Sequence, residues 1–271
     1  MKIFKSKEQL KSEIGNKKSI SFVPTMGGLH KGHISLIKTA KKYKNEILVS
    51  IYINPKQFNK KDDFKKYPRN LKKDLKILKK LKVNYLYLPT YKDLFKFKPS
   101  HEVYLHKFSK ILCGKYRKYH FRGVLDVVNR FLEIIRPKYL FLGLKDFQQL
   151  TLIKKHILKN KIHTKIISCK TIRESSGIAC SSRNFNLDKN QMKIAKNIYT
   201  YLIKIKKKTE KNFKLFDSSL FKKDLIKIGV NKVDYLEIIN KKSLQKPKKL
   251  KETFNIFIAY YLNKIRLIDN V

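Results

Sequence analysis

The feature of the sequence that most constrains its fold is a succession of short, almost continuously apolar runs separated by stretches with helical periodicity. The first run, ISFVP at 20–24, is followed by a predicted helix over 33–43 and a second run over 46–54. Strands that are covered on both faces have such continuous apolar runs, and a helix between two of them returns the chain to the same end of the sheet. The order therefore predicts a βαβ unit with parallel strands.

The same alternation continues to about residue 172, with predicted helices over 68–81, 121–136 and 146–158 and predicted strands over 84–89, 138–143 and 165–172. The pattern then changes to a predicted helix over 189–207, a lysine-rich connector, and strands over 233–240 and 254–262. We therefore predict an α/β fold, a doubly wound parallel sheet of the Rossmann-like type with a smaller C-terminal α+β domain. The expected domains are 1–170 and 171–271.

The formal net charge of +45 raises the question of a nucleic-acid partner. Of the 65 basic residues only eight are arginine, and the lysines are spread over almost every predicted surface segment. Arginine is the usual side chain for two-pronged contacts to bases and phosphates. We therefore expect no specific nucleic-acid partner, while a basic nucleic-acid-binding protein stays open as an alternative.

The cysteines also narrow the class of protein. Cys113, Cys169 and Cys180 form no CxxC pair, which indicates neither a disulfide framework nor a zinc ribbon. Residues 1–15 lack the apolar core of a secretory signal, and no apolar run approaches the length needed to cross a bilayer. These features favour a cytoplasmic protein without a membrane partner.

Three of the nine glycines, Gly27, Gly28 and Gly32, lie within six residues of one another directly after the first predicted strand. A glycine-rich turn between a strand and a helix lets backbone N–H groups approach a phosphate, and the helix dipole favours the anion. The segment PTMGGLHKGH at 24–33 is neither GxGxxG nor a P-loop, so it predicts phosphate binding without either common fingerprint.

His30 and His33 stand at the start of the predicted helix, three residues apart. At that spacing both imidazoles can point at the same phosphates and donate hydrogen bonds as a leaving group departs. Two alternatives stay open: the histidines pack or lie on the surface, or their HxxH spacing binds zinc. Because no cysteine or glutamate lies at a convincing spacing, we predict no protein-bound metal.

A second constellation, GLKDFQQL at 143–150, lies at the end of a predicted strand, where parallel sheets bind ligands. Lys145 is suited to phosphate oxygens and Asp146 to ribose hydroxyls. The alternative is an ordinary turn with Asp146 as the helix cap. Of Gln148 and Gln149 only one can face the ligand, because neighbours on a helix point about 100° apart.

Two further segments carry polar candidates. Ser181, Ser182 and Arg183 combine two hydroxyls with a guanidinium and suit a polyphosphate; the alternative is a capping turn before the next helix. Gln57 follows the second predicted strand and can bind a hydroxyl or a carboxylate, whereas the alternative is that the Asn-Pro before it only ends the strand.

Taken together, six segments resemble the signature segments of the pantothenate synthetase family in order and spacing: 24–33, 50–58, 67–75, 120–124, 143–150 and 176–184. The closing segment 266–270 is also similar. The HxGH element at 30–33 is shared with the wider nucleotidyltransferase superfamily, so another HxGH nucleotidyltransferase is the alternative within enzymes.

The resemblance implies an ATP-dependent ligase that first joins pantoate to AMP, with release of pyrophosphate, and then transfers the pantoyl group to β-alanine. ATP is implied as substrate, with Mg²⁺, and a homodimer as the assembly. His33 is implied as the proton donor, with His30, Lys145 and Arg183 beside it in catalysis. Gln57 and Gln149 are implied to bind pantoate, Gln57 also β-alanine, with Asn54 and Tyr67 in support.

By the same resemblance the ATP site comprises Met26, Gly27, Gly28, Leu29, His30, Lys31, Gly32, His33, Gly143, Leu144, Lys145, Asp146, Ile172, Cys180, Ser181, Ser182 and Arg183. Three positions depart from the family's pattern. Leu144 and Cys113 stand where glutamate is usual, and Lys73 stands where an acidic residue is frequent, beside Asp74.

Overall fold

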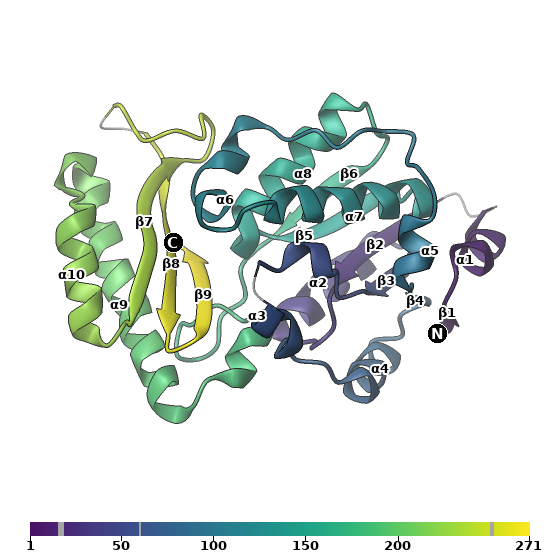
Figure 1. The fold of residues 1–271 in the computed structure, drawn as a ribbon, viewed down its shortest axis with the longest axis horizontal. Coiled ribbons are helices and arrows are strands. Elements are labelled where there is room, and N and C mark those ends of the chain that lie inside the picture. The colour runs from purple at the N-terminus through teal and green to yellow at the C-terminus, as the bar shows by residue number, and fades with distance from the viewer. Residues whose placement is uncertain (16–18, 60, 250–251) are drawn as a thin grey trace. The chain divides into compact units, whose positions relative to one another are not determined.

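The computed structural model describes residues 1–15, 19–59, 61–249 and 252–271, which form two compact units. The first unit comprises 1–109 and 117–172, and the second comprises 110–116 and 173–271 (Figure 1). The short segment 110–116 thus groups with the second unit although it interrupts the first in sequence. No sequence pattern marked it.

A six-stranded parallel sheet forms the centre of the first unit, in the order β1-β4-β3-β2-β5-β6. Its strands are β1 (Lys2–Phe4), β2 (Ile20–Thr25), β3 (Glu46–Ile51), β4 (Tyr85–Tyr87), β5 (Tyr139–Gly143) and β6 (Lys165–Cys169). Its helices are α1 (Lys7–Ile14), α2 (Lys31–Lys41), α3 (Lys61–Lys65), α4 (Leu71–Lys80), α5 (Tyr91–Phe95), α7 (His120–Ile135) and α8 (Phe147–Lys159). The prediction of a doubly wound α/β fold is confirmed.

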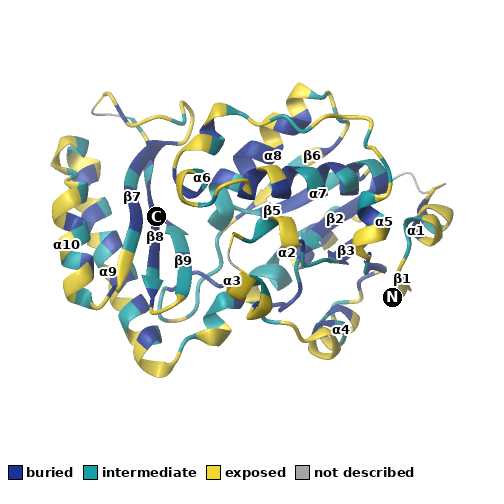
Figure 2. Cartoon of the chain, viewed as in Figure 1, coloured by how far each residue is buried: buried dark blue, intermediate teal, exposed yellow. Residues whose placement is uncertain are grey.

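Side chains of the inner strands alternate between two apolar layers, one on each face of the sheet. Val23 and Val49 belong to a cluster with Leu36 and Ile37 of α2 and Leu78 of α4. On the other face, residues next to these in sequence pack against α7, and the Phe22 ring lies edge-on to Phe131 at 5.5 Å between centroids. Both layers are buried, which is why these strands have continuous apolar runs (Figure 2).

The chain winds outward from β2 in two directions, to β3 and β4 on one side and to β5 and β6 on the other. The strand order therefore reverses between β2 and β5. Ligands of such sheets bind beyond the carboxyl ends of the strands at this point. The segments that follow Thr25 and Gly143 meet there, which are the two constellations predicted from the sequence.

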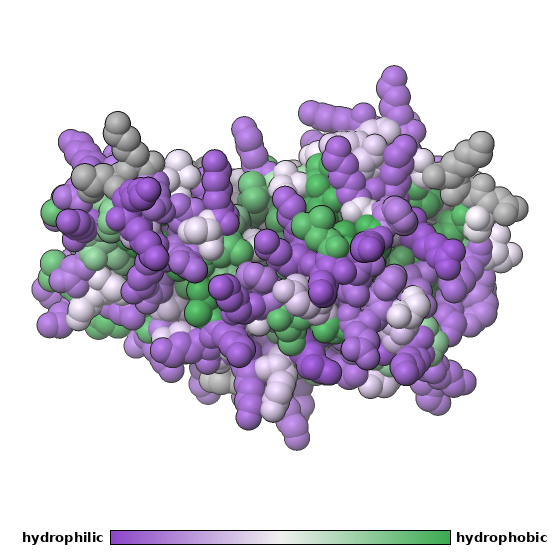
Figure 3. Space-filling model, turned by 90° about the horizontal axis from the view of Figure 1, so that it is seen from above, coloured by the Kyte–Doolittle hydropathy of each residue, from purple (hydrophilic) through white to green (hydrophobic). Residues whose placement is uncertain are grey.

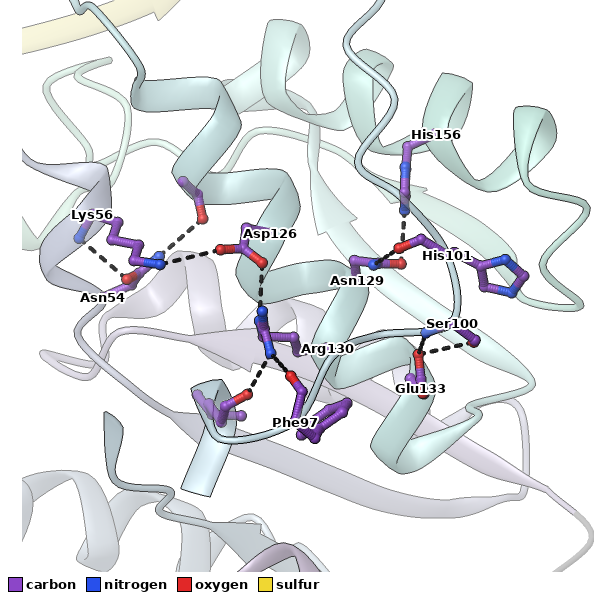
Figure 4. A network of polar contacts seen from close by, with 12 residues as sticks. Asn54, Lys56, Phe97, Ser100, His101, Asp126, Asn129, Arg130, Glu133 and His156 are labelled. Atoms are coloured by element: carbon purple, nitrogen blue, oxygen red, sulfur yellow. Dashed lines mark hydrogen bonds and ion pairs between the residues drawn. The ribbon is translucent and has the colours of Figure 1, made fainter. Parts of the chain in front are cut away.

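A long irregular segment, 97–108, is fastened to α7 and α8 by a row of polar side chains (Figure 4). Five side chains bind its backbone: Arg130 to the Phe97 carbonyl, Glu133 to the Ser100 amide, Asn129 to the His101 carbonyl, His156 to the Tyr104 amide and Gln148 to the Phe108 carbonyl. Backbone groups that no strand or helix pairs are thereby satisfied.

The second unit has an antiparallel sheet of β7 (Lys232–Asn240), β8 (Phe254–Leu262) and β9 (Ile265–Asn270), with helices α6 (Cys113–Tyr116), α9 (Lys189–Lys211) and α10 (Ser218–Ile228). Apolar residues of α9, α10 and the sheet form one buried cluster, with Leu202, Leu225, Leu236 and Ile258 among them. The sequence predicted β7, β8 and most of α9, but α10 fell in what was predicted as a connector.

Cys113, at a position where the resembled family has glutamate, lies in a polar cluster of the second unit. Its sulfur is 3.1 Å from the Tyr235 hydroxyl and 3.7 Å from Nη1 of Arg266. The Nε of Arg266 donates to Asp234 at 2.8 Å. The guanidinium therefore contacts the Asp234 carboxylate through Nε and the Cys113 thiol through its two Nη atoms.

The surface in Figure 3 is covered mainly by hydrophilic side chains, and hydrophobic ones are confined to small areas. This agrees with lysines spread along the whole chain rather than gathered in one segment. In the described part of the chain, no helix combines the length and apolar character that crossing a membrane demands.

The close approach of α7 to the turn at Pro55–Gln57 predicts a strict need for glycine at position 123. A Cβ there would lie 2.3 Å from the Lys56 carbonyl oxygen. Since backbone cannot yield easily, Gly123→Ala should cost about 1–3 kcal/mol and lower the thermal midpoint by several degrees. Gly143→Ala is the matched control, because a Cβ there meets nothing within 4 Å. Equal midpoints for the two variants in differential scanning calorimetry would contradict this reading.

His156 predicts a pH dependence of stability. Its Nδ1 accepts from the Tyr104 amide at 3.2 Å, and burial lowers its pKa to about 4. In the unfolded chain the pKa of this imidazole is about 6.5. At a pH between the two pKa values, the imidazole is therefore protonated in the unfolded chain and neutral in the folded protein. The contribution of His156 to the free energy of unfolding is therefore at its full value above the pKa of the unfolded state. It is lost as the pH falls towards 4.

Thermal midpoints measured between about pH 4.5 and pH 7 should consequently rise less steeply for His156→Gln than for the wild type. His163→Gln, which removes an exposed imidazole, serves as the control and should keep the wild-type slope. Parallel curves for all three proteins would show that His156 does not contribute.

Candidate active site

The glycine turn after β2 is held by a carboxylate from another part of the chain. Asp74, on α4, is buried and accepts from the Gly28 amide at 2.9 Å and from the Leu29 amide at 2.8 Å. Gly27 and Gly28 have φ values of +77° and +61°, a backbone conformation that favours glycine. The phosphate contacts expected of this segment therefore fall to its side chains and its other amides.

Sequence reasoning missed the role of Asp74, although a signal was present. The apolar stripe of α4 includes Leu78 and Leu81, which lie four and seven residues after Asp74. A carboxylate on the buried face of a helix needs a fixed partner, because an unpaired buried charge is costly. What the sequence could not show was that the partner is a turn 46 residues away.

His30 and His33 do stand at the start of α2, and both rings help to begin it. His30 is the N-cap, and its Nδ1 accepts from the Gly32 amide at 3.1 Å. The Nδ1 of His33 accepts from the His30 amide at 3.4 Å, and the two ring centroids are 4.1 Å apart. Since Nδ1 is the acceptor in both rings, the proton of each neutral imidazole is on Nε2.

The environment keeps His33 neutral. Desolvation, followed by the charges of His30 and Lys145, holds the pKa of His33 well below its usual value. Lys145 influences His33 although it belongs to the segment after β5, so the structure brings together the HxGH segment and the lysine predicted from GLKDFQQL. A neutral imidazole beside an ammonium group provides hydrogen-bond donation without adding a second charge.

The segment after β5 is a single 3₁₀ turn, Leu144–Asp146, which leads into α8. Asp146 is the N-cap residue of α8, but its side chain makes no capping hydrogen bond. The Nζ of Lys145 lies 3.4 Å from its carboxylate. The alternative that Asp146 serves as an ordinary capping side chain is therefore wrong, and the carboxylate is directed to the lysine instead.

Gln57 ends a 3₁₀ turn, Pro55–Gln57, that follows β3. Asn54 is fully buried and fixes this turn: its Oδ1 accepts from the Lys56 amide at 3.2 Å, and its Nδ2 donates to the Gly123 carbonyl at 2.9 Å. Tyr67 is buried against Phe58, with the rings 5.6 Å apart. Asn54 and Tyr67, expected as supporting residues, thus shape the surroundings of Gln57.

The two adjacent glutamines at the start of α8 differ in burial, because neighbouring side chains on a helix point in different directions. Gln148 is buried, and its Nε2 donates to the Phe108 carbonyl at 2.7 Å. Gln149 is partly exposed. Gln149 is therefore the one left to meet a ligand.

The remaining candidates belong to the second unit, except Ile172, which ends the first. Residues 173–179 form a hairpin-like bridge, and Arg173 binds both carboxylate oxygens of Asp269. Ser181 then caps a 3₁₀ turn by accepting from the Arg183 amide at 3.2 Å. The alternative, a capping turn for the next helix, is not what Ser181 forms, because α9 begins at Lys189 and is capped by Asp188 and Gln191.

Within the residues that the structure describes, no three side chains of His, Cys, Asp or Glu gather into a group that could hold a metal ion. All three cysteines are buried, and none of them forms a disulfide. The candidates of the first unit offer imidazole and ammonium groups, and those of the second offer hydroxyls and a guanidinium. Groups of these kinds suit an anion.

Comparison with known proteins gives one consistent result. Residues 2–271 match the family model of pantoate-β-alanine ligase. The pantothenate synthetase of Thermosipho africanus is 35% identical over 278 residues, covering 100% of this chain and 99% of that protein. The pantothenate synthetase of Francisella tularensis subsp. novicida is 38% identical over 272 residues, covering 98% of this chain and 94% of that protein.

Solved structures agree with these relatives. A crystal structure of pantoate-β-alanine ligase from Francisella tularensis, complexed with βγ ATP and β-alanine, superposes with a TM-score of 0.85 at 37% identity and covers 100% of this chain and 97% of that one. The pantothenate synthetase of Thermus thermophilus gives a TM-score of 0.87 at 26% identity, covering 100% and 99%.

The contacts of Asp74 predict that replacing it weakens nucleotide binding, although its carboxylate is bound to the glycine turn and not to the nucleotide. In Asp74→Asn an amide group replaces one carboxylate oxygen and opposes a backbone N–H, which costs about 1–3 kcal/mol. The glycine turn should loosen, and the affinity for a non-hydrolysable ATP analogue, measured by calorimetry, should fall about tenfold. Lys73→Ala changes the exposed neighbour and is the control. Undiminished affinity in Asp74→Asn would mean that the turn needs no such anchor.

Proposed function

Because the chain belongs to the pantoate-β-alanine ligase family, we propose that it joins pantoate to β-alanine in a reaction driven by ATP, with the site described above as its centre. The observation that carries the assignment of the site is the meeting of His30, His33 and Lys145 where the strand order of the sheet reverses. This is the position at which doubly wound sheets bind nucleotides.

In the first step a carboxylate oxygen of pantoate attacks the α-phosphorus of ATP. The bond from that phosphorus to the bridging oxygen breaks, pyrophosphate leaves, and a pantoyl adenylate forms. Negative charge accumulates on the departing phosphates. The Lys145 ammonium group and the Nε2–H groups of His30 and His33 stabilise it as it forms, which lowers the barrier.

His33 is suited to this task because it is neutral before the nucleotide binds. A neutral ring can donate a hydrogen bond from Nε2 to a phosphate oxygen as negative charge develops there. A permanent imidazolium would be repelled by the positive charge of the nearby Lys145. Anionic phosphates beside it raise its pKa again. His33 then approaches the protonated state from which a proton can pass to pyrophosphate.

In the second step the amine of β-alanine attacks the acyl carbon of the adenylate, and the bond from that carbon to the phosphate oxygen breaks. AMP leaves and an amide bond forms. No covalent intermediate on the protein is required. We assign pantoate to Gln57 and Gln149 and the β-alanine side to Gln57, since the turn at Pro55–Gln57 follows β3, the neighbour of β2 in the sheet.

We also assign Ser181, Ser182 and Arg183 to the binding of ATP, together with the remaining residues of the ATP set. Their chemistry supports the assignment, because two hydroxyls and a guanidinium are donors to phosphate oxygens. Mg²⁺ enters as the counter-ion of ATP and is held chiefly by the phosphates, as is usual for nucleotide-bound Mg²⁺.

A homodimer in the cytoplasm completes the proposal. Three buried cysteines without a disulfide suit a reducing compartment, and the resemblance to pantothenate synthetases supports the dimer. Sedimentation equilibrium measures the assembly directly. A monomer at micromolar concentration would remove that part of the proposal and leave the chemistry untouched.

Lys145→Met tests the catalytic assignment. Pantoate-dependent exchange of pyrophosphate into ATP should fall at least about 100-fold, because the charge that stabilises the leaving phosphates is gone. The thermal midpoint should change little, since Asp146, an ion partner of Lys145, is itself nearly half exposed. Lys155→Met, on the exposed side of α8, is the control and should retain full exchange. The formation of ADP in place of AMP by the wild type would refute the reaction itself.

A further inference from the structure

The Gln57 carbonyl receives an unusual number of donors from one short segment. Gln57 is the last residue of a 3₁₀ turn, so its carbonyl has no partner within the turn. The Nη2 of Arg117 donates to this oxygen at 2.9 Å, and the Nδ1 of His120 lies 2.8 Å from it. Two side chains, one at the first residue of α7 and one three residues before it, therefore converge on one atom of the segment assigned to pantoate.

A third contact closes a triangle and fixes the protonation of His120. The Nη1 of Arg117 lies 3.1 Å from the Nε2 of His120. A guanidinium can only donate, so Nε2 must accept. The proton of the neutral ring is then on Nδ1, where it is donated to the Gln57 carbonyl. Arg117 thus holds His120 in the one tautomer that can bind this carbonyl.

The two segments are also joined on either side of this triangle. The Nδ2 of Asn59 donates to the Lys118 carbonyl at 2.6 Å. Between Arg117 and His120, Tyr119 has a φ of +61° although it is not glycine and its side chain is 70% exposed. Such a conformation persists only where the surroundings enforce it. Its exposed side chain is not what enforces it, whereas the residues on both sides are held: the Lys118 carbonyl by Asn59, and the His120 ring by the Gln57 carbonyl.

From these contacts we propose that Arg117 and His120 are positioning residues for pantoate: they fix the backbone of Gln57 so that its carboxamide stands ready for the substrate. The inference rests on the proposed assignment of Gln57 to pantoate. Neither residue needs to touch the substrate. A displacement of about 1 Å in a substrate-binding group is enough to lower the rate by up to about 100-fold, so the backbone anchor is expected to act through KM and kcat for pantoate.

The test compares steady-state kinetics of four variants. His120→Leu should raise the pantoate KM about tenfold and leave the ATP KM within about twofold of the wild type. His120→Asn places an amide N–H close to the position of Nδ1 and should recover most of the loss. Arg117→Met, whose side chain is only partly buried, should resemble His120→Leu and serves if that variant does not fold.

Asn129→Leu is the matched structural control, because Asn129 is buried on the same helix and its Nδ2 binds the His101 carbonyl instead. It should lower the thermal midpoint without shifting the pantoate KM. A His120→Leu variant that behaves in the same way would overturn the proposal. So would a His120→Asn variant that recovers nothing.

A double-mutant cycle with Gln57→Ala separates this inference from the proposed function. If Gln57→Ala raises the pantoate KM, adding His120→Leu should change it by less than about twofold, because residues that act through one another are not additive. Full additivity would overturn the positioning role alone. A pantoate KM unchanged by Gln57→Ala itself would instead remove the assignment of Gln57.

Discussion

The site depends first on one buried carboxylate. Asp74 holds the amides of Gly28 and Leu29, and so joins α4 to the turn between β2 and α2. Without it two positive-φ glycines in succession would have wide conformational freedom, and the position of the histidines that follow would vary. The same carboxylate leaves little room beside Gly27, where a Cβ would lie 3.1 Å from its Oδ2. The Asp74 carboxylate therefore both holds this turn in place and restricts position 27 to glycine.

Acidic residues are few in this chain, and several of them form ion pairs that join separate segments. The chain has 20 acidic residues against 65 basic ones. Several are used at structural junctions: Asp126 receives both Lys56 and Arg130, Asp234 receives Arg266, and Asp269 receives Arg173. A protein with so large an excess of lysine repels itself, and buried or partly buried pairs resist screening by salt better than exposed ones. The few acidic residues thus stabilise contacts between segments, while most lysines lie on the surface.

The local pattern predicted most of the strands of the parallel sheet but missed several elements, among them β1, α10 and β9. β2, α2, β5 and α9 follow from apolar runs and helical spacing that need no partner to be seen. β1 has three residues and exists through its pairing with β4. α10 was hidden among lysines, although Asp217 before it and Gly229 after it are an N-cap and a left-handed C-cap. β9 follows β8 after only two residues, Asn263 and Lys264, a hairpin signal that was also present.

By itself the sequence determined the parallel α/β architecture and pointed to the segments proposed to carry the chemistry, because strand burial, helix periodicity and glycine placement are properties of neighbouring residues. Only the tertiary structure decided what holds those segments. Asp74 lies 46 residues from Gly28, and His120 lies 63 from Gln57. Tertiary structure also decided the state of His33, whose pKa is lowered by desolvation and by Lys145 from another strand end. Desolvation and charge act through space, so no spacing along the chain encodes them.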